Sequence, residues 1–215
     1  MKKNLVVILA SYPEPGKVKT ALGKQIGKEQ AAALYKAMLL DCVQNCQSKE
    51  HELALCFEPK SKQKEFLKLV KIKKSYPQAG GPLGDKLQDC FEHFFKEFTN
   101  ILVIRADFPS ISASMLRKAY ASLRSKDVVL GKAEDGSFYL VGLKEPHALF
   151  DDIEWQSNAL LTQLIKNADR NHLSYALMPA ILGINSQKEL QQFRRKVMKD
   201  ECPLTYSVLQ KIKIK

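Results

Sequence analysis

Two runs of uncharged, strand-forming residues constrain the fold of this chain more than any other feature. NLVVILA occupies residues 4–10, and NILVI opens a similar segment at 100–112. Neither run alternates apolar and polar residues, as a strand with one solvated face would. Each leads into a polar loop and then into a segment with helical periodicity. This order predicts an α/β fold with a mainly parallel sheet and helices on both of its faces.

The other expected elements continue this alternation. We expect further strands at 52–58 and 173–178, a hairpin insertion within 127–143, and helices at 20–47, 62–70, 77–98, 113–124, 158–169 and from Ser186 onward. The hairpin turns at KAEDGS, whose Asp-Gly pair is typical of a turn, and the first helix should be broken or bent near Gly27. No repeat or linker interrupts the sequence, so we expect a single domain over residues 1–215.

The composition is that of an ordinary globular protein with an excess of positive charge. Of the 215 residues, 45% are hydrophobic and 27% are charged, and the formal net charge is +11. This charge favours anionic ligands. The basic clusters at 68–74 and near the C-terminus lack the interleaved aromatic residues that stack on bases, so we expect no specific nucleic-acid binding.

Three features favour a cytoplasmic protein without a membrane span. No apolar run approaches the ~18 residues that a transmembrane helix needs. The start MKKNLVVILA resembles a signal peptide but has no small-residue cleavage site, so we interpret it as the first strand. The five cysteines are odd in number and lack paired metal-ligand spacing, which fits a reducing compartment.

The strand ends indicate where a ligand should bind. In a parallel α/β sheet, ligands bind beyond the carboxyl ends of the strands. This rule selects the loops at 11–20, 105–110 and 131–137, all of which carry charge, glycine or both. We therefore expect Gly16, Asp107 and Asp135 to line one cleft.

Two of these loops allow a binding role and a purely structural one. Gly16 with Lys17 and Lys19 can hold a diphosphate, or it can form a turn with solvated lysines. The loop lacks the spacing of a phosphate-binding P-loop. Asp107 can hold Mg²⁺ or Mn²⁺, because such cations prefer oxygen ligands, or it can cap the helix or turn that follows.

Asp135 and Asn185 also have alternative roles. Asp135 can point into the cleft as a general base, or it can simply form the hairpin turn. Asn185 can be a neutral metal ligand, or it can cap the helix that begins near Ser186. The four histidines are scattered and show no metal-ligand pattern.

A series of motifs from about residue 8 to about residue 193 resembles a known family. The motifs are YPEPGKVKTAL, GPLGDKL, RADFPSIS, VVLGKAEDGSFYLVGL, LF before IEW, and GINSQKEL. In this order and with these gaps, they resemble a bacterial family of GT-A-like transferases. That family is related to the nucleotidyltransferases of molybdopterin and phospholactate metabolism. Its members are described as glycosyltransferases, including ones linked to arsenosugar biosynthesis. The resemblance implies the nucleotide-diphospho-sugar transferase (GT-A-like) fold.

The resemblance also implies a role for each matching residue. Nucleotide-binding residues would be Gly16, Lys17, Lys19, Thr20 and Arg105; the metal ligands would be Asp107 and Asn185; Asp135 would be catalytic, with Gly136 and Ser137 on the acceptor side.

The chain departs from the family pattern at several of these positions. Ala21 stands where the family has arginine, and Arg105 can partly compensate for the lost charge. Ser137 replaces a glycine. Gly183 and Asn185 replace two aspartates, so the resemblance implies a weakly bound divalent cation, Mg²⁺ or Mn²⁺.

The implied function is that of a metal-dependent glycosyltransferase with a nucleotide-diphosphate sugar donor and a small-molecule acceptor. One alternative is a nucleotidyltransferase that acts on a nucleoside triphosphate and a phosphorylated acceptor. The other is a nucleotide-binding homologue with impaired catalysis, which the departures at Ala21, Gly183 and Asn185 favour.

Overall fold

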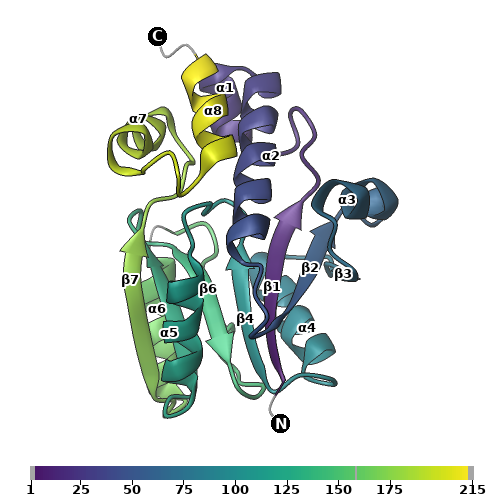
Figure 1. The fold of residues 1–215 in the computed structure, drawn as a ribbon. Helices are drawn as coiled ribbons and strands as arrows, with labels where there is room; N and C mark the ends of the chain where they lie inside the picture. Colours follow the sequence, from purple (N-terminus) through teal and green to yellow (C-terminus); the bar gives the residue numbers. More distant parts are fainter. Residues whose placement is uncertain (1–2, 158, 213–215) are drawn as a thin grey trace.

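The computed structural model describes residues 3–157 and 159–212, which are built around a seven-stranded sheet (Figure 1). Its strand order is β3-β2-β1-β4-β6-β5-β7. The strands are β1 (Asn4–Ser11), β2 (Glu52–Glu58), β3 (Lys74–Pro77), β4 (Asn100–Arg105), β5 (Val128–Ala133), β6 (Phe138–Leu143) and β7 (Tyr175–Ile181). β6 runs antiparallel to its neighbours β4 and β5, and the other pairings are parallel. The predicted fold class is therefore confirmed, including the β5–β6 hairpin.

β1 lies in the middle of the sheet, between β2 and β4. Val6 and Ile8 belong to the apolar cluster on one face, whereas Leu5 and Val7 belong to the cluster on the other. All four side chains are fully buried. A strand that is buried on both faces cannot carry a charge without a partner. This explains why residues 4–10, which form most of β1, are uncharged.

Helices cover both faces of the sheet (Figure 1). They are α1 (Thr20–Ile26), α2 (Lys28–Asn45), α3 (Gln63–Val70), α4 (Leu83–Phe94), α5 (Ala113–Leu123), α6 (Leu160–Arg170), α7 (Gln187–Lys196) and α8 (Pro203–Lys211). Of these, α1, α7 and α8 lie beyond the carboxyl end of the sheet. Side chains of α2, α3 and α5 pack in the same cluster as Val6, and those of α4 and α6 pack with Leu5. A short 3-10 helix, η1 (Lys60–Lys62), precedes α3.

A third apolar cluster joins the N-terminal and C-terminal helices beyond the sheet. Leu22 of α1, Leu34 of α2, Leu190 of α7 and Leu209 of α8 are all fully buried in it. Figure 1 shows α8 beside α1 and α2. This packing holds the last part of the chain against α1 and α2.

The predicted break near Gly27 is confirmed. Gly27 has a φ of 97°, in a region that favours glycine, and it separates α1 from α2. Two other elements differ from the sequence prediction. The short edge strand β3 and the helix α8 were not predicted. The predicted helix at 158–169 appears as α6, and residue 158 itself is outside the described residues, as are residues 1–2 and 213–215.

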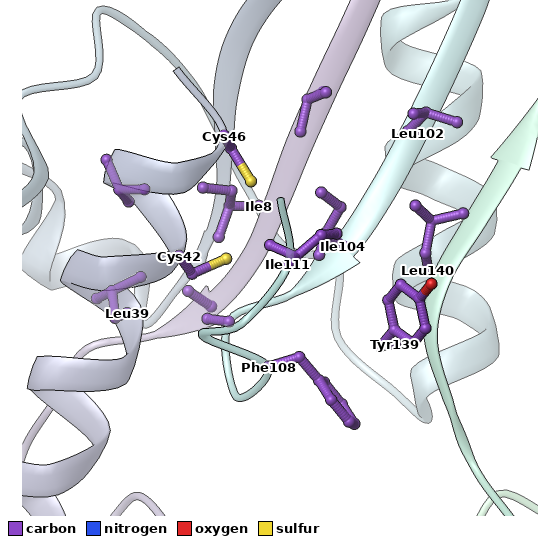
Figure 2. Close-up of a cluster of buried hydrophobic side chains, with 14 of the residues drawn as sticks. Ile8, Leu39, Cys42, Cys46, Leu102, Ile104, Phe108, Ile111, Tyr139 and Leu140 are labelled. Carbon is purple, nitrogen blue, oxygen red and sulfur yellow. The ribbon is translucent and has the colours of Figure 1, made fainter. Parts of the chain in front are cut away.

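The cysteines are buried and free. Cys42 and Cys46 pack with Ile8 and Ile111 in the cluster drawn in Figure 2. Among the described residues, no helix is long and apolar enough to cross a membrane.

Phe91 offers a test of the layer formed by α4 and α6. Its side chain is 1% exposed, and its ring lies 5.9 Å from the rings of Phe95 and Phe150. We expect Phe91→Ala to lower the free energy of unfolding by about 3–5 kcal/mol in urea denaturation, because it leaves a cavity. The half-buried Phe95 is the matched control, and Phe95→Ala should cost clearly less. Equal losses would show that this layer is not packed as described.

Candidate functional site

A cleft of about 520 Å³ opens at the carboxyl ends of β1, β2 and β4. Its lining has a cationic region, a polar region and an apolar wall. The cationic region contains Lys17, Lys19, Arg105, Asp107 and Asn185; the polar region contains Ser11, Glu58, Gln78 and Lys86; the wall contains Leu83, Trp155 and Leu160. The cleft therefore lies at the edge of the sheet that the sequence predicted.

The loop after β1 presents its two lysines differently. Lys17 is exposed at the cleft, whereas the Lys19 side chain is only 8% exposed. Lys19 has a φ of 47°, a left-handed backbone conformation that is uncommon for a residue with a side chain. Thr20 also lines the cleft, but Gly16 does not: it lines an adjacent hollow of about 240 Å³. The expectation that Gly16 lines the cleft is therefore wrong.

Lys19 connects the three loops of the cleft. Its Nζ donates to Asp107 Oδ2 at 2.9 Å and to Asn185 Oδ1 at 2.6 Å. Asp107 follows β4, and Asn185 follows β7. The two predicted metal ligands are thus brought together, and the atom between them is the ammonium nitrogen of a lysine.

Arg105, the last residue of β4, is the second cation at Asp107. Its Nη2 donates to the same Oδ2 atom at 2.9 Å, and its Nη1 donates to the Phe138 carbonyl at 3.2 Å. The guanidinium also lies over the rings of Phe108 and Phe138, at 5.3 and 5.8 Å. These contacts fix the guanidinium beside the cleft.

The charges around Asp107 determine its ionisation. Burial alone would raise the pKa of this carboxyl, but the nearby Arg105 and Lys19 hold the pKa below its ordinary value. Burial lowers the pKa of Lys19, and Asp107 opposes that shift. Asp107 is therefore an anion at neutral pH, and its Oδ2 accepts hydrogen bonds from Lys19 and Arg105.

The hairpin turn places Asp135 at the rim of this network. Its Oδ1 accepts hydrogen bonds from the backbone N–H of Ser137 at 2.9 Å and from the Ser137 hydroxyl at 2.6 Å. Its Oδ2 accepts one from Asn185 Nδ2 at 3.2 Å. Gly136 between them has a φ of 84°, which the turn requires. Asp135 is exposed and does not line the cleft itself, so the expectation that it lines the cleft is wrong for this residue as well, although Asn185 connects it to Lys19.

The helix-capping alternatives for Asp107 and Asn185 are wrong, because other residues cap the helices that follow. Ser112 caps α5 by accepting a hydrogen bond from the backbone of Met115. Ser186 caps α7 in a capping box with Glu189. The side chains of Asp107 and Asn185 are thus free to face the cleft.

The polar region of the cleft was not predicted. Glu58, at the end of β2, accepts hydrogen bonds from the hydroxyl of Ser11 at 2.8 Å and from Lys86. Burial would raise the pKa of Glu58, but these two contacts hold it below its ordinary value. Gln78 donates to the carbonyls of Ala10 and Cys56. The rule of strand ends could have selected Ser11 and Glu58, since both are the last residues of their strands.

The arrangement does not fit a divalent cation while Lys19 lies between the two predicted ligands. Both oxygens that would hold the cation accept hydrogen bonds from Lys19. Within the described residues, no group of three or more His, Cys, Asp or Glu side chains is placed to hold a metal ion. The divalent cation thus stays a prediction.

Packing explains the missing aspartate at position 183. A Cβ atom at Gly183 would lie 2.8 Å from Cε1 of the Phe108 ring, which is fully buried. Figure 2 shows Phe108 at the edge of the core cluster near Tyr139. A side chain at position 183 therefore requires movement of a buried ring.

The buried pairing of Asp107 generates a stability prediction. Asp107→Asn should lower the free energy of unfolding by about 3–5 kcal/mol, because it leaves the buried ammonium of Lys19 without a carboxylate. The measurement is urea denaturation at neutral pH. Asp152→Asn, which breaks the exposed pair of Asp152 with Arg170, is the control and should leave stability near that of the unchanged chain.

A double-mutant cycle completes this test. In a Lys19→Met background, the loss caused by Asp107→Asn should be smaller, because the stranded ammonium is gone. Additive losses would contradict the described coupling between the two side chains.

Solved structures of known proteins share this fold. A protein from Desulfovibrio desulfuricans G20, provisionally described as a nucleotide-diphospho-sugar transferase, superposes with a TM-score of 0.88 and 24% identity over 98% of this chain and 95% of that chain. The 4-diphosphocytidyl-2C-methyl-D-erythritol synthase of Anaerococcus prevotii gives a TM-score of 0.59, with 12% identity over 97% and 99% of the chains. CMP:2-keto-3-deoxy-manno-octonic acid synthetase, solved with CTP, gives 0.52, with 15% identity over 90% and 97%. The fold is that of the nucleotide-diphospho-sugar transferases.

A search of curated proteins returns no match to the sequence. Residues 40–157 match the family described as "Uncharacterized protein conserved in bacteria (DUF2064)". This match spans more than half of the chain, from α2 through the hairpin to the segment before α6. The chain belongs to this bacterial family.

Proposed function

We propose that this protein is a transferase whose donor is a nucleoside-diphosphate sugar. The observation that carries the proposal is the cationic region of the cleft, where Lys17, Lys19 and Arg105 lie at the carboxyl ends of β1 and β4. A diphosphate is the ligand that such a group of cations suits best. The fold supports the proposal, because nucleotide-diphospho-sugar transferases and nucleotidyltransferases share it.

The polar region supplies what a nucleobase needs. Glu58 and Gln78 lie at the β2 end of the cleft, where their carboxylate and amide groups can exchange hydrogen bonds with a base. The volume of about 520 Å³ is within the range of roughly 300–1000 Å³ found for small-molecule sites. A donor lying across the cleft would place its base near β2 and its diphosphate near β4.

The proposed reaction transfers the sugar from the diphosphate to a small-molecule acceptor. As the sugar leaves, negative charge grows on the diphosphate, and the ammonium and guanidinium groups beside it stabilise that charge. Asp135 is the proposed base that takes the proton of the acceptor hydroxyl. Its two oxygens are oriented by Ser137 and Asn185, which supports this role.

A divalent cation at Asp107 and Asn185 would add charge for the diphosphate if it bound there. The fit of that ion is poor while Lys19 lies between the two side chains. No step of the proposed reaction is therefore assigned to a metal.

The second candidate function is nucleotidyl transfer to a phosphorylated acceptor. It is favoured by the structural similarity to the 4-diphosphocytidyl-2C-methyl-D-erythritol synthase and to the CMP:2-keto-3-deoxy-manno-octonic acid synthetase, the second of which was solved with CTP. The same cleft would then bind a nucleoside triphosphate, and the acceptor would attack its α-phosphate. Pyrophosphate is released only in this reaction, so product analysis separates the two candidates.

The proposal predicts that nucleotides and nucleotide-sugars stabilise the folded protein. A ligand at a hundred times its Kd raises the free energy of unfolding by about 2.7 kcal/mol, which a thermal-shift screen detects. Lys17→Ala should weaken binding by about tenfold or more, since it removes one charge-assisted contact to phosphate. Lys36→Ala on the outside of α2 is the matched control and should leave binding unchanged. If no nucleotide or nucleotide-sugar shifts the melting temperature, the proposed function is wrong.

A further inference from the structure

The ammonium of Lys19 occupies the position in which a cation would bridge Asp107 and Asn185. Its nitrogen lies 2.9 Å and 2.6 Å from their oxygens. An ammonium group has three N–H donors, and these two contacts use two of them. Since Lys19 also lines the cleft, the remaining N–H is available to a ligand there.

A divalent cation would compete with this ammonium. Mg²⁺ binds oxygen ligands at about 2.0–2.1 Å, so an ion held by the same two oxygens would have to displace the Lys19 nitrogen. Displacement would leave a buried ammonium without its carboxylate, which is strongly unfavourable. Arg105, 2.9 Å from the same Asp107 oxygen, would repel the incoming ion.

The residues around Lys19 also favour an ammonium group over a divalent cation at this position. The ring of Phe108 fills the space that a side chain at position 183 would need, so a second carboxylate cannot be added there without repacking. The guanidinium of Arg105 lies over that ring, at 5.3 Å. Where a metal site requires negative charge, the cluster formed by Lys19, Arg105 and Asp107 has two cations and one anion.

The backbone of Lys19 supports a role beyond a solvated turn. Its φ of 47° and ψ of 43° place it in the left-handed region, which is unfavourable for a residue with a Cβ atom. Such strain persists where the surroundings fix it, and it is frequent at ligand sites. In this loop the surroundings include the two hydrogen bonds of the side chain.

We propose that Lys19 is a built-in cation that replaces the divalent metal, so that this protein binds nucleoside diphosphates without metal. The proposal rests on the proposed function, since it assumes that the cleft binds a diphosphate. The third N–H of Lys19 contacts the diphosphate, while Asp107 and Asn185 hold the ammonium in place. Arg105 and Lys17 supply the remaining positive charge.

The first experiment is calorimetric titration of the full chain with UDP, GDP, CDP and ADP, in EDTA and again in Mn²⁺. For each nucleotide that binds, we expect the two Kd values to agree within about twofold. A complex bridged by metal would instead bind at least about tenfold more weakly in EDTA. Such a difference would overturn the inference and leave the proposed function standing.

The second experiment exchanges the built-in cation for a metal site. Lys19→Met should weaken binding by about tenfold or more in EDTA, while melting curves show that the fold is retained. The double variant Lys19→Met with Asn185→Asp removes the ammonium and adds a carboxylate. It should bind nucleotide weakly in EDTA and recover affinity in Mn²⁺. Lys24→Met, on the exposed face of α1, is the matched control and should behave as the unchanged chain.

The outcomes separate the inference from the function on which it rests. Equal binding by the unchanged chain and by Lys19→Met in EDTA would overturn the inference alone. Failure of every nucleotide to bind in both conditions would overturn the inference and the proposed function together. Electron paramagnetic resonance of Mn²⁺ without nucleotide gives an independent reading: the double variant should bind the ion and the unchanged chain should not.

Discussion

The ion pair between Lys19 and Asp107 is the interaction on which the organisation of the cleft depends. It joins residues 88 positions apart, and the contact of Lys19 with Asn185 spans 166 positions. The loops after β1, β4 and β7 are thus fixed to one another by a single ammonium group. Because that group is buried, separating the loops would leave it without a partner, so the geometry of the cleft and the stability of the fold depend on the same contact.

Packing beneath the ion pair determines which charges can surround it. The Phe108 ring fills the space next to Gly183, and Arg105 lies over that ring while donating to Asp107. The Phe108 ring thereby leaves no room for an acidic side chain at position 183. The same ring contacts the guanidinium of Arg105 and helps to hold it in place. The positive character of the cleft therefore follows from an apolar contact as much as from the choice of charged residues.

The sequence predicted the architecture well, because uncharged strands that are buried on both faces leave a clear pattern. It missed β3, since that strand has four residues, lies at the sheet edge and ends in proline. The family resemblance implied that Asp107 and Asn185 lie together, and both side chains do accept hydrogen bonds from Lys19. The sequence could not show that Lys19 turns inward whereas Lys17 stays in solvent, or that Gly16 faces another hollow, because these depend on the φ angles of one loop. Lys17 and Lys19 differ in exposure because of the local backbone geometry, which their residue type does not reveal.

Asn185 shows why a lost charge does not mean a lost site. Its amide oxygen accepts from Lys19 and its amide nitrogen donates to Asp135, so one side chain joins an ammonium to a carboxylate. An aspartate at this position could make the first contact but would repel Asp135 instead of making the second. With a metal ion in the cleft, that repulsion would be offset by the ion. With Lys19 there, which carries a single charge, a neutral amide at position 185 is the better match.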